Sequence, residues 1–129
     1  MAYRKTWVRN AMMITYWTTT TLIALLLLAS AGSYMFSDAT IQGIAELGFP
    51  PFFRIQLAVL KLIAAVVLVL PQAPIYAKEW AYAGVGLFLL TAIVAHAANR
   101  DPIAISLLNI GFFAILIASN VSFHRLVAT

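Results

Sequence analysis

The sequence is short of two things that most soluble enzymes use, cysteine and charge. Among its 129 residues there is no cysteine, which excludes disulfide bonds, thiolate nucleophiles and cysteine-ligated metal sites. Charged residues make up only 9% of the chain, compared with roughly 25% in an ordinary soluble domain. The sequence also has no glycine-rich phosphate loop and no internal repeat, so it carries no signature of a nucleotide-binding or repeat protein.

Apolar residues take the place of the missing charge. They make up 64% of the chain, and the mean hydropathy is +0.97. A helix needs about 20 mostly apolar residues to cross a bilayer, and the sequence contains four such segments, at about residues 11–31, 52–70, 80–98 and 102–123. The sequence therefore predicts an all-α membrane protein, a single four-transmembrane-helix bundle over residues 1–129, with no room for a soluble domain.

The first apolar segment has the outline of a secretory signal. Arg4, Lys5 and Arg9 precede it, and it ends in the small residues Ala29-Ser30-Ala31, which resemble a cleavage site. The apolar core of a signal is usually about 7 to 15 residues long, and this one is longer. We therefore expect it to be retained as the first membrane helix.

Basic residues near the helix ends predict the orientation, because cytoplasmic loops carry an excess of lysine and arginine. With the N-terminus in the cytoplasm, the basic residues on the inner side are Arg4, Lys5, Arg9, Lys78 and Arg125, and those on the outer side are Arg54 and Arg100. Both termini are therefore expected in the cytoplasm. An aromatic belt at the inner interface would comprise Tyr3, Trp7, Tyr76, Trp80 and Tyr82. This topology and anionic lipid headgroups account for the net charge of +4, so no nucleic-acid partner is expected.

The longest connection, residues 32–51, lies on the outer side in this topology and predicts a short amphipathic helix. Ser37 is a suitable N-cap, Gly48 is suited to the C-terminal end, and Pro50-Pro51 stops the helix. One interpretation is an interfacial helix that tethers two spans. The other is a lid that carries Glu46 over a cavity.

Five short motifs carry a resemblance to a known family. In chain order they are Tyr16-Trp17, Glu46-Leu47-Gly48-Phe49-Pro50-Pro51, Leu60-Lys61, Lys78-Glu79-Trp80-Ala81-Tyr82-Ala83-Gly84, and Ala92 with His96. Together they resemble the DoxX-like family of small four-helix bacterial membrane proteins, over about residues 16–120. The resemblance implies a multi-pass protein of the bacterial inner (plasma) membrane. It also implies a bundle related to sterol-isomerase and sigma-2-receptor type membrane proteins, and more distantly to a membrane subunit of thiosulfate:quinone oxidoreductase.

One lysine stands in the middle of the second apolar segment, QLAVLKLIAAVVLVLP at residues 56–71. Inserting a lysine at this depth costs about 2.5 to 3.5 kcal/mol. Lys61 should therefore face the bundle interior and contact Glu46, Asn109 or a bound ligand. Arg54 lies seven residues earlier, on the same face of the helix, so two cations share one stripe.

Further polar residues fall in the same outer half of the bundle. His96 is near the outer end of the third segment, and Asn109 lies roughly 10 Å below the outer end of the fourth, at 1.5 Å per residue. We take Lys61 and His96 as candidate catalytic residues, and Glu46, Arg54, Gln56 and Asn109 as candidate ligand-binding residues, with no metal site expected. Plainer roles stay open, since Asn109 can hydrogen-bond between helices and His96 can cap its own helix.

Two further polar residues are interpreted as structural. Asp101 precedes Pro102, so we expect it either to cap the fourth helix or to pair with Arg100. His124 is expected at the membrane interface, on the opposite side from His96. For that reason the two histidines should not ligate one haem together.

Three classes of function remain open from the sequence. The first is binding of a small lipophilic molecule among the helices, with isomerisation or other acid–base chemistry by Lys61 and His96. The second is a non-catalytic membrane subunit of an oxidoreductase or quinone-linked complex, and the third is a structural membrane protein. No cofactor is evident, although haem and quinone stay open as ligands. The expected partners are membrane lipids, a small lipophilic ligand, and a second copy of the chain or an oxidoreductase.

Overall fold

The computed structural model describes residues 2–128, with side chains from Lys5 onward. Tyr3 and Arg4, which entered the predicted belt and orientation, therefore have no described side chains. Five helices make up the described chain: α1 (Ala2–Phe36), α2 (Asp38–Glu46), α3 (Pro51–Val69), α4 (Ile75–Ala98) and α5 (Ile103–Ala128). Four of them, all but α2, are long and apolar enough to cross a membrane. The predicted all-α bundle with a short helix in the first loop is confirmed. Helix α1 runs beyond both of its predicted ends, and the other three spanning helices each run beyond one predicted end.

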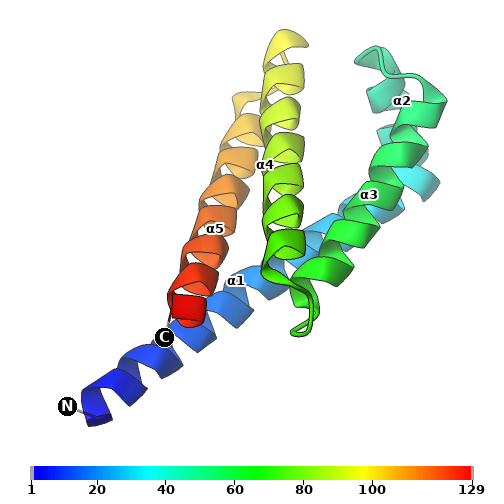
Figure 1. Cartoon of the computed structure of the whole chain (residues 1–129). Coiled ribbons are helices and arrows are strands. Elements are labelled where there is room, and N and C mark those ends of the chain that lie inside the picture. The colour runs from blue at the N-terminus through cyan, green and yellow to red at the C-terminus, as the bar shows by residue number, and fades with distance from the viewer. Residues whose placement is uncertain (1, 129) are drawn as a thin grey trace.

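The helices form two pairs that diverge from a common base (Figure 1). Helix α1 packs against α3 and α5, α4 packs against α5 and α3, and the short α2 packs on α1 and α3. Both chain termini and the α3–α4 turn lie at one end, which we call the closed end (Figure 1). Helix α2 and the α4–α5 turn lie at the other end, the open end, which is the predicted outer side (Figure 1).

Helix α1 supplies the central stripe of the core. Its buried residues recur every three or four positions, at Tyr16, Thr20, Ile23, Leu27 and Ala31, which places them on one face of the helix. In lipid, apolar surface alone gives little drive for helices to associate, so close packing and interhelical hydrogen bonds must hold the bundle together. Small and medium side chains on this stripe allow α1 to approach its neighbours closely.

Buried residues of the α4–α5 pair are confined to the closed end. On α4 they lie between Lys78 and Leu89, and on α5 between Leu116 and Phe123. The remaining outer parts of both helices carry no fully buried residue. The pair therefore packs tightly at the closed end and stands away from α2 and α3 at the open end.

The open end contains two helix C-termini of the same type. In α2, Gly48 has φ 95°, and Phe49 N–H and Gly48 N–H donate to Ile44 O (3.3 Å) and Ala45 O (3.0 Å), the Schellman pattern that suits glycine. Ser37 accepts a hydrogen bond from Thr40 N–H at the start of α2. The predicted cap at Ser37 and helix end at Gly48 are confirmed.

At the end of α4 the same pattern occurs without glycine. Arg100 has φ 57°, Asp101 N–H donates to His96 O at 3.0 Å, and Arg100 N–H donates to Ala97 O at 3.2 Å. A side chain in this left-handed conformation costs about 1 to 2 kcal/mol. The turn therefore holds some strain, and it carries Asp101 back toward the last turn of α4.

Large apolar side chains cover the outward faces of the four long helices, as a lipid-facing surface requires. Trp7, Tyr76 and Trp80 are exposed near the closed end, at 65%, 71% and 82%, in agreement with an interfacial belt there. The prediction that Tyr82 belongs to this belt is wrong. Its ring is only 5% exposed, because its position on α4 faces the α1–α5 interface.

Candidate functional site

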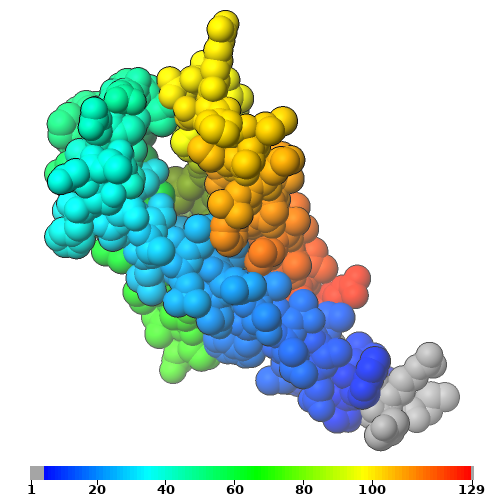
Figure 2. Space-filling model, turned by 180° about the vertical axis from the view of Figure 1, so that it is seen from behind, coloured from blue at the N-terminus to red at the C-terminus, as the bar shows by residue number. Residues whose placement is uncertain are grey.

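A cavity of about 570 Å³ lies at the open end, where the two helix pairs diverge. Its walls come from the last turns of α1, from α2, from the first half of α3 and from the outer half of α4. The space-filling view shows it as a hollow between the α1–α2 region and the α4–α5 region (Figure 2). Because the hollow opens between helices along the side of the bundle, it faces the surface that lies against lipid.

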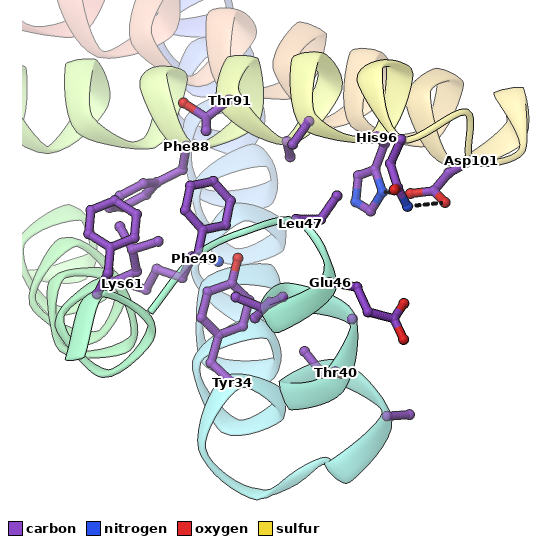
Figure 3. Close-up of a pocket in the computed structure, with 18 of the residues that line it drawn as sticks. Tyr34, Thr40, Glu46, Leu47, Phe49, Lys61, Phe88, Thr91, His96 and Asp101 are labelled. Atoms are coloured by element: carbon purple, nitrogen blue, oxygen red, sulfur yellow. Dashed lines mark hydrogen bonds and ion pairs between the residues drawn. The ribbon is translucent and has the colours of Figure 1, made fainter. Parts of the chain in front are cut away.

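The cavity wall is mostly apolar and rich in aromatic rings (Figure 3). Phe49 and Phe53 stack at 5.3 Å between ring centroids, and Phe88 and Tyr34 line the deeper part. Few ionisable groups reach this wall (Figure 3). Lys61 lies deep in the cavity. Glu46, His96 and Asp101 lie at the end of the cavity next to the α4–α5 turn, which we call the mouth. Apolar walls with a few placed polar groups are the usual composition of a small-molecule site.

Lys61 points into the bundle, as its position in the membrane predicted. Its side chain is only 7% exposed. The ammonium donates to Ser30 Oγ at 2.6 Å and lies 3.7 Å from the centroid of the Tyr34 ring and 5.7 Å from that of Phe88. The predicted contact with Glu46 or Asn109 is wrong, because Ser30 of α1 occupies the position facing it.

The charge of Lys61 has no counter-charge among the described side chains. The ion pairs within this part of the chain are His96 with Asp101 and His124 with Glu79. Cation–π contacts and one neutral hydroxyl offset only part of the cost of burying an ammonium. Lys61 therefore retains unused hydrogen-bonding capacity on the wall of a cavity.

His96 and Asp101 form a pair at the mouth of the cavity (Figure 3). Asp101 Oδ2 lies 2.6 Å from His96 Nδ1, and Asn99 donates to the other carboxylate oxygen at 3.0 Å. The hydrogen bond from His96 holds the pKa of the Asp101 carboxyl below its usual range. The carboxylate fixes the ring through Nδ1, which leaves Nε2 free to act toward the cavity. The partner of Asp101 is thus His96, and the pairing with Arg100, one of the two roles expected for Asp101, is not found.

Three predicted ligand-binding residues do not line the cavity. Arg54 donates to the Tyr34 carbonyl in the last turn of α1, so it caps that helix, where a cation is favourable. Gln56 is exposed on the outer face of α3, and Asn109 is half-buried on α5, behind α4. These positions depend on the rotation and splay of the helices, which spacing within one helix does not reveal.

A second buried lysine, Lys78, has a structural role that the sequence analysis did not predict. There it entered only as a basic residue on the inner side of the membrane. Lys78 is 2% exposed, and its ammonium donates to Leu68 O (2.9 Å), Val67 O (3.3 Å) and Tyr16 Oη (3.1 Å). Val67 O would ordinarily accept from the N–H of residue 71, which is Pro71 and has none. The proline after an apolar helix was the sequence signal that a donor is needed there.

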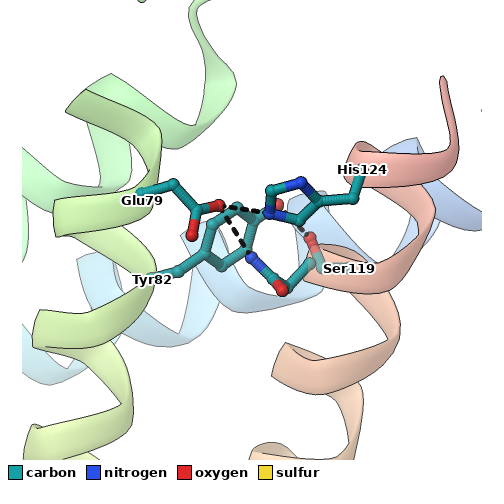
Figure 4. Close-up of polar contacts among 5 residues, drawn as sticks. Glu79, Tyr82, Ser119 and His124 are labelled. Atoms are coloured by element: carbon teal, nitrogen blue, oxygen red, sulfur yellow. Dashed lines mark hydrogen bonds and ion pairs between the residues drawn. The ribbon is translucent and has the colours of Figure 1, made fainter. Parts of the chain in front are cut away.

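A polar cluster at the closed end joins α4 to α5 (Figure 4), and Thr20 connects it to α1. Ser119 shares 2.7 Å hydrogen bonds with Thr20 and Tyr82. Glu79 Oε1 lies 2.7 Å from His124 Nε2 and accepts from Asn120 at 3.1 Å. Among the described residues no buried polar side-chain atom lacks a partner, so the buried hydroxyls of this cluster are satisfied.

No group of three or more histidines or carboxylates that could hold a metal ion occurs within the described residues. His96 and His124 lie at opposite ends of the bundle, on the last turn of α4 and near the end of α5. A haem therefore cannot be ligated by both. A quinone-sized molecule, by contrast, needs only an apolar cavity with hydrogen-bonding groups.

Comparison with known proteins gives one finding. Residues 18–119 match the model of a family described as the DoxX-like family. No curated protein and no solved structure was found to match the chain. The matched range includes α2, α3 and α4 entirely, and with them all the residues of the cavity wall.

Proposed function

The chain belongs to the DoxX-like family, and we propose that it binds a small lipophilic molecule in the open-end cavity. With both termini in the cytoplasm, as the basic residues predict, this end faces outward across a bacterial inner membrane. A hydrophobic molecule dissolved in the bilayer would reach the site through the side opening between the helix pairs (Figure 2).

The observation that carries this proposal is the position of Lys61. An ionisable residue in the membrane is costly and is usually retained for a use. Lys61 is 7% exposed, lies on an apolar wall, and has one neutral hydrogen-bond partner, Ser30. A bound molecule with a polar end would supply the further hydrogen-bond acceptor that the protein does not provide for Lys61.

The pair of His96 and Asp101 favours acid–base chemistry on the bound molecule as a second, dependent function. A histidine oriented by a carboxylate through one nitrogen can exchange a proton through the other. Both residues line the mouth of the same cavity as Lys61. Isomerisation of a lipophilic substrate is the reaction class that such a site supports, with Lys61 polarising the substrate.

The test is to fill the cavity without touching its polar groups. Ala95 lines the cavity, whereas Ala97, two residues later on α4, is exposed on the outer face. Wild type, Ala95→Trp and Ala97→Trp are purified in mild detergent, and the retained small molecules are measured by mass spectrometry. We expect wild type and Ala97→Trp to retain the same lipophilic molecule, and Ala95→Trp to lose it while remaining folded.

The same experiment separates the remaining function classes. A subunit that only docks an oxidoreductase, or a purely structural bundle, needs no occupied cavity. In either case wild type would carry no specific molecule, and the two tryptophan variants would behave alike. Equal retention by all three proteins would also contradict binding in the cavity.

A further inference from the structure

We infer that the ligand of the cavity is a single-chain lipophilic acid whose anionic head binds Lys61. This inference rests on the proposed binding function and specifies the chemical class of the ligand. It draws on three independent features: the uncompensated ammonium, the arrangement of charge along the cavity, and the size of the cavity.

The first feature is the missing counter-charge. Breaking a buried ion pair by leaving one charge alone costs more than removing both charges. Among the described side chains, no carboxylate pairs with Lys61, and its one hydrogen-bond partner is the neutral hydroxyl of Ser30. A neutral carbonyl would accept a hydrogen bond from the ammonium, but only an anion also cancels its charge.

The second feature is the opposite sign of charge at the two ends of the cavity. Glu46 and Asp101 are acidic and lie near the mouth, whereas Lys61 lies in the depth (Figure 3). Hydrogen bonds from His96 and Asn99 already occupy the Asp101 carboxylate, so it stays ionised and repels an acid. The head of an acidic ligand is therefore directed away from the mouth and toward Lys61.

The third feature is the volume. If each non-hydrogen atom takes about 30 Å³, the share of a water molecule in the liquid, then a cavity of about 570 Å³ holds about 20 such atoms. This is the size of one long-chain fatty acid, whereas a two-chain phospholipid would have to extend out through the side opening. The stacked rings of Phe49 and Phe53 would lie beside its hydrocarbon chain.

The test compares three probes of equal length and different head groups: palmitate, palmitamide and hexadecylammonium. Purified protein is titrated with each probe in detergent, and the dissociation constant is measured by thermal shift and native mass spectrometry. A hydrogen bond to a charged group contributes about 1.5 to 3 kcal/mol, so palmitate should bind wild type about tenfold to hundredfold more tightly than palmitamide. Hexadecylammonium should bind least tightly of the three.

Variants assign the preference to one residue. Lys61→Met should lose the preference for the acid and keep the binding of the amide, because methionine retains the shape of the lysine stem. Lys78→Gln, at the other buried lysine, should keep the preference in whatever fraction remains folded. The wild-type ratio of acid to amide stands as a test even where a variant fails to fold.

Each outcome has one meaning. Equal binding of palmitate and palmitamide overturns the acidic ligand but leaves the binding of lipophilic molecules in place. Absence of binding by all three probes overturns both proposals. A further arm places the protein in nanodiscs of phosphatidylcholine with and without phosphatidylglycerol. If phosphatidylglycerol displaces palmitate, the anion is a phospholipid head group, and the single-chain assignment is overturned.

Discussion

The two ends of the bundle each bury one lysine, and the surroundings of the two lysines differ. At the closed end, Lys78 donates to two backbone carbonyls that end α3 and to a tyrosine hydroxyl. At the open end, Lys61 has one serine hydroxyl and two aromatic rings on a cavity wall. Lys78 supplies hydrogen-bond donors to carbonyls at the end of α3, where Pro71 has no N–H. Lys61, by contrast, can still donate further hydrogen bonds. Burial alone therefore does not distinguish a structural cation such as Lys78 from the cation that we propose serves a ligand, Lys61.

The same contrast holds for the histidines. His124 and Glu79 sit at the edge of the closed-end cluster, which also includes Asn120 and connects helices that are already packed. His96 and Asp101 lie at the mouth of the cavity, on a turn whose Arg100 is in a left-handed conformation. Strained backbone beside a cavity is common where a protein binds or reacts. The polar contacts of the closed end connect packed helices, whereas those of the open end lie beside the cavity where we propose the function.

Among the variants that test the comparison of the two ends, Lys78→Met is expected to change stability the most. Removing the ammonium leaves Val67 O without its side-chain donor and Leu68 O with only the Tyr16 hydroxyl at 3.3 Å, which should cost about 3 kcal/mol of unfolding free energy. Lys61→Met, the matched control, removes an uncompensated charge and should change stability by about 1 kcal/mol or less. Thermal unfolding in detergent, followed by circular dichroism, measures both. Equal losses would remove the distinction between the two lysines.

The next effect concerns Ser119, which links α5 to α1 and α4. Ser119→Ala leaves the buried hydroxyls of Thr20 and Tyr82 without their shared partner, at a cost of about 2 kcal/mol. Ser106→Ala, on the outer part of the same helix, should cost within about 0.5 kcal/mol. The same unfolding assay applies, and the comparison fails if both alanines have the same effect.

A smaller pair of effects compares the two helix C-termini of the open end. Gly48→Ala should destabilise by about 1 kcal/mol, because Gly48 has φ 95° and alanine is strained there. Arg100→Gly should stabilise by about 0.5 kcal/mol, since relief of the left-handed conformation outweighs the greater freedom of glycine in the unfolded chain. Opposite shifts of the melting temperature are expected. Shifts of the same sign would contradict the assignment of strain to Arg100.

The smallest expected effect is a pH dependence at the mouth of the cavity. Asp101 has a lowered pKa in the folded protein because His96 donates a hydrogen bond to it. The stability from this interaction is fully present above about pH 4, the ordinary pKa of an aspartate, and is lost as the pH falls through the lower folded value. The difference in melting temperature between wild type and Asp101→Asn should therefore be constant above about pH 4 and close below it. A difference that widens on acidification would refute the pairing.

Much of the fold could be predicted from the sequence because bilayer thickness fixes the length of apolar segments. The short helix from Ser37 to Gly48 was also predictable, since both of its ends follow local rules of capping. The burial of Lys61 followed from the cost of a charge in lipid. Each of these conclusions depends only on neighbouring residues and the membrane.

The partners of the buried groups could not be predicted, because they depend on how one helix is rotated against another. Ser30, the partner of Lys61, belongs to the Ala29-Ser30-Ala31 sequence that resembles a cleavage site. Nothing else in the sequence pointed to a contact with Lys61. Gln56 and Asn109 were expected in the same outer half of the bundle as Lys61, but they do not line the cavity, owing to the rotation of α3 and the splay of α4 and α5. For Lys78 a local signal did exist, since Pro71 leaves Val67 O without its usual donor.

The central claim is that the open end of the bundle is a ligand site and the closed end is not. An experimental density map of the protein, purified from its own membrane into a lipid nanodisc, tests this most directly. The account predicts density for an elongated molecule in the cavity, with its polar end within hydrogen-bond distance of Lys61 Nζ, while Lys78 remains on the carbonyls of Val67 and Leu68. A map in which α4 closes onto α2 and α3, with Lys61 held by protein groups alone, would contradict it.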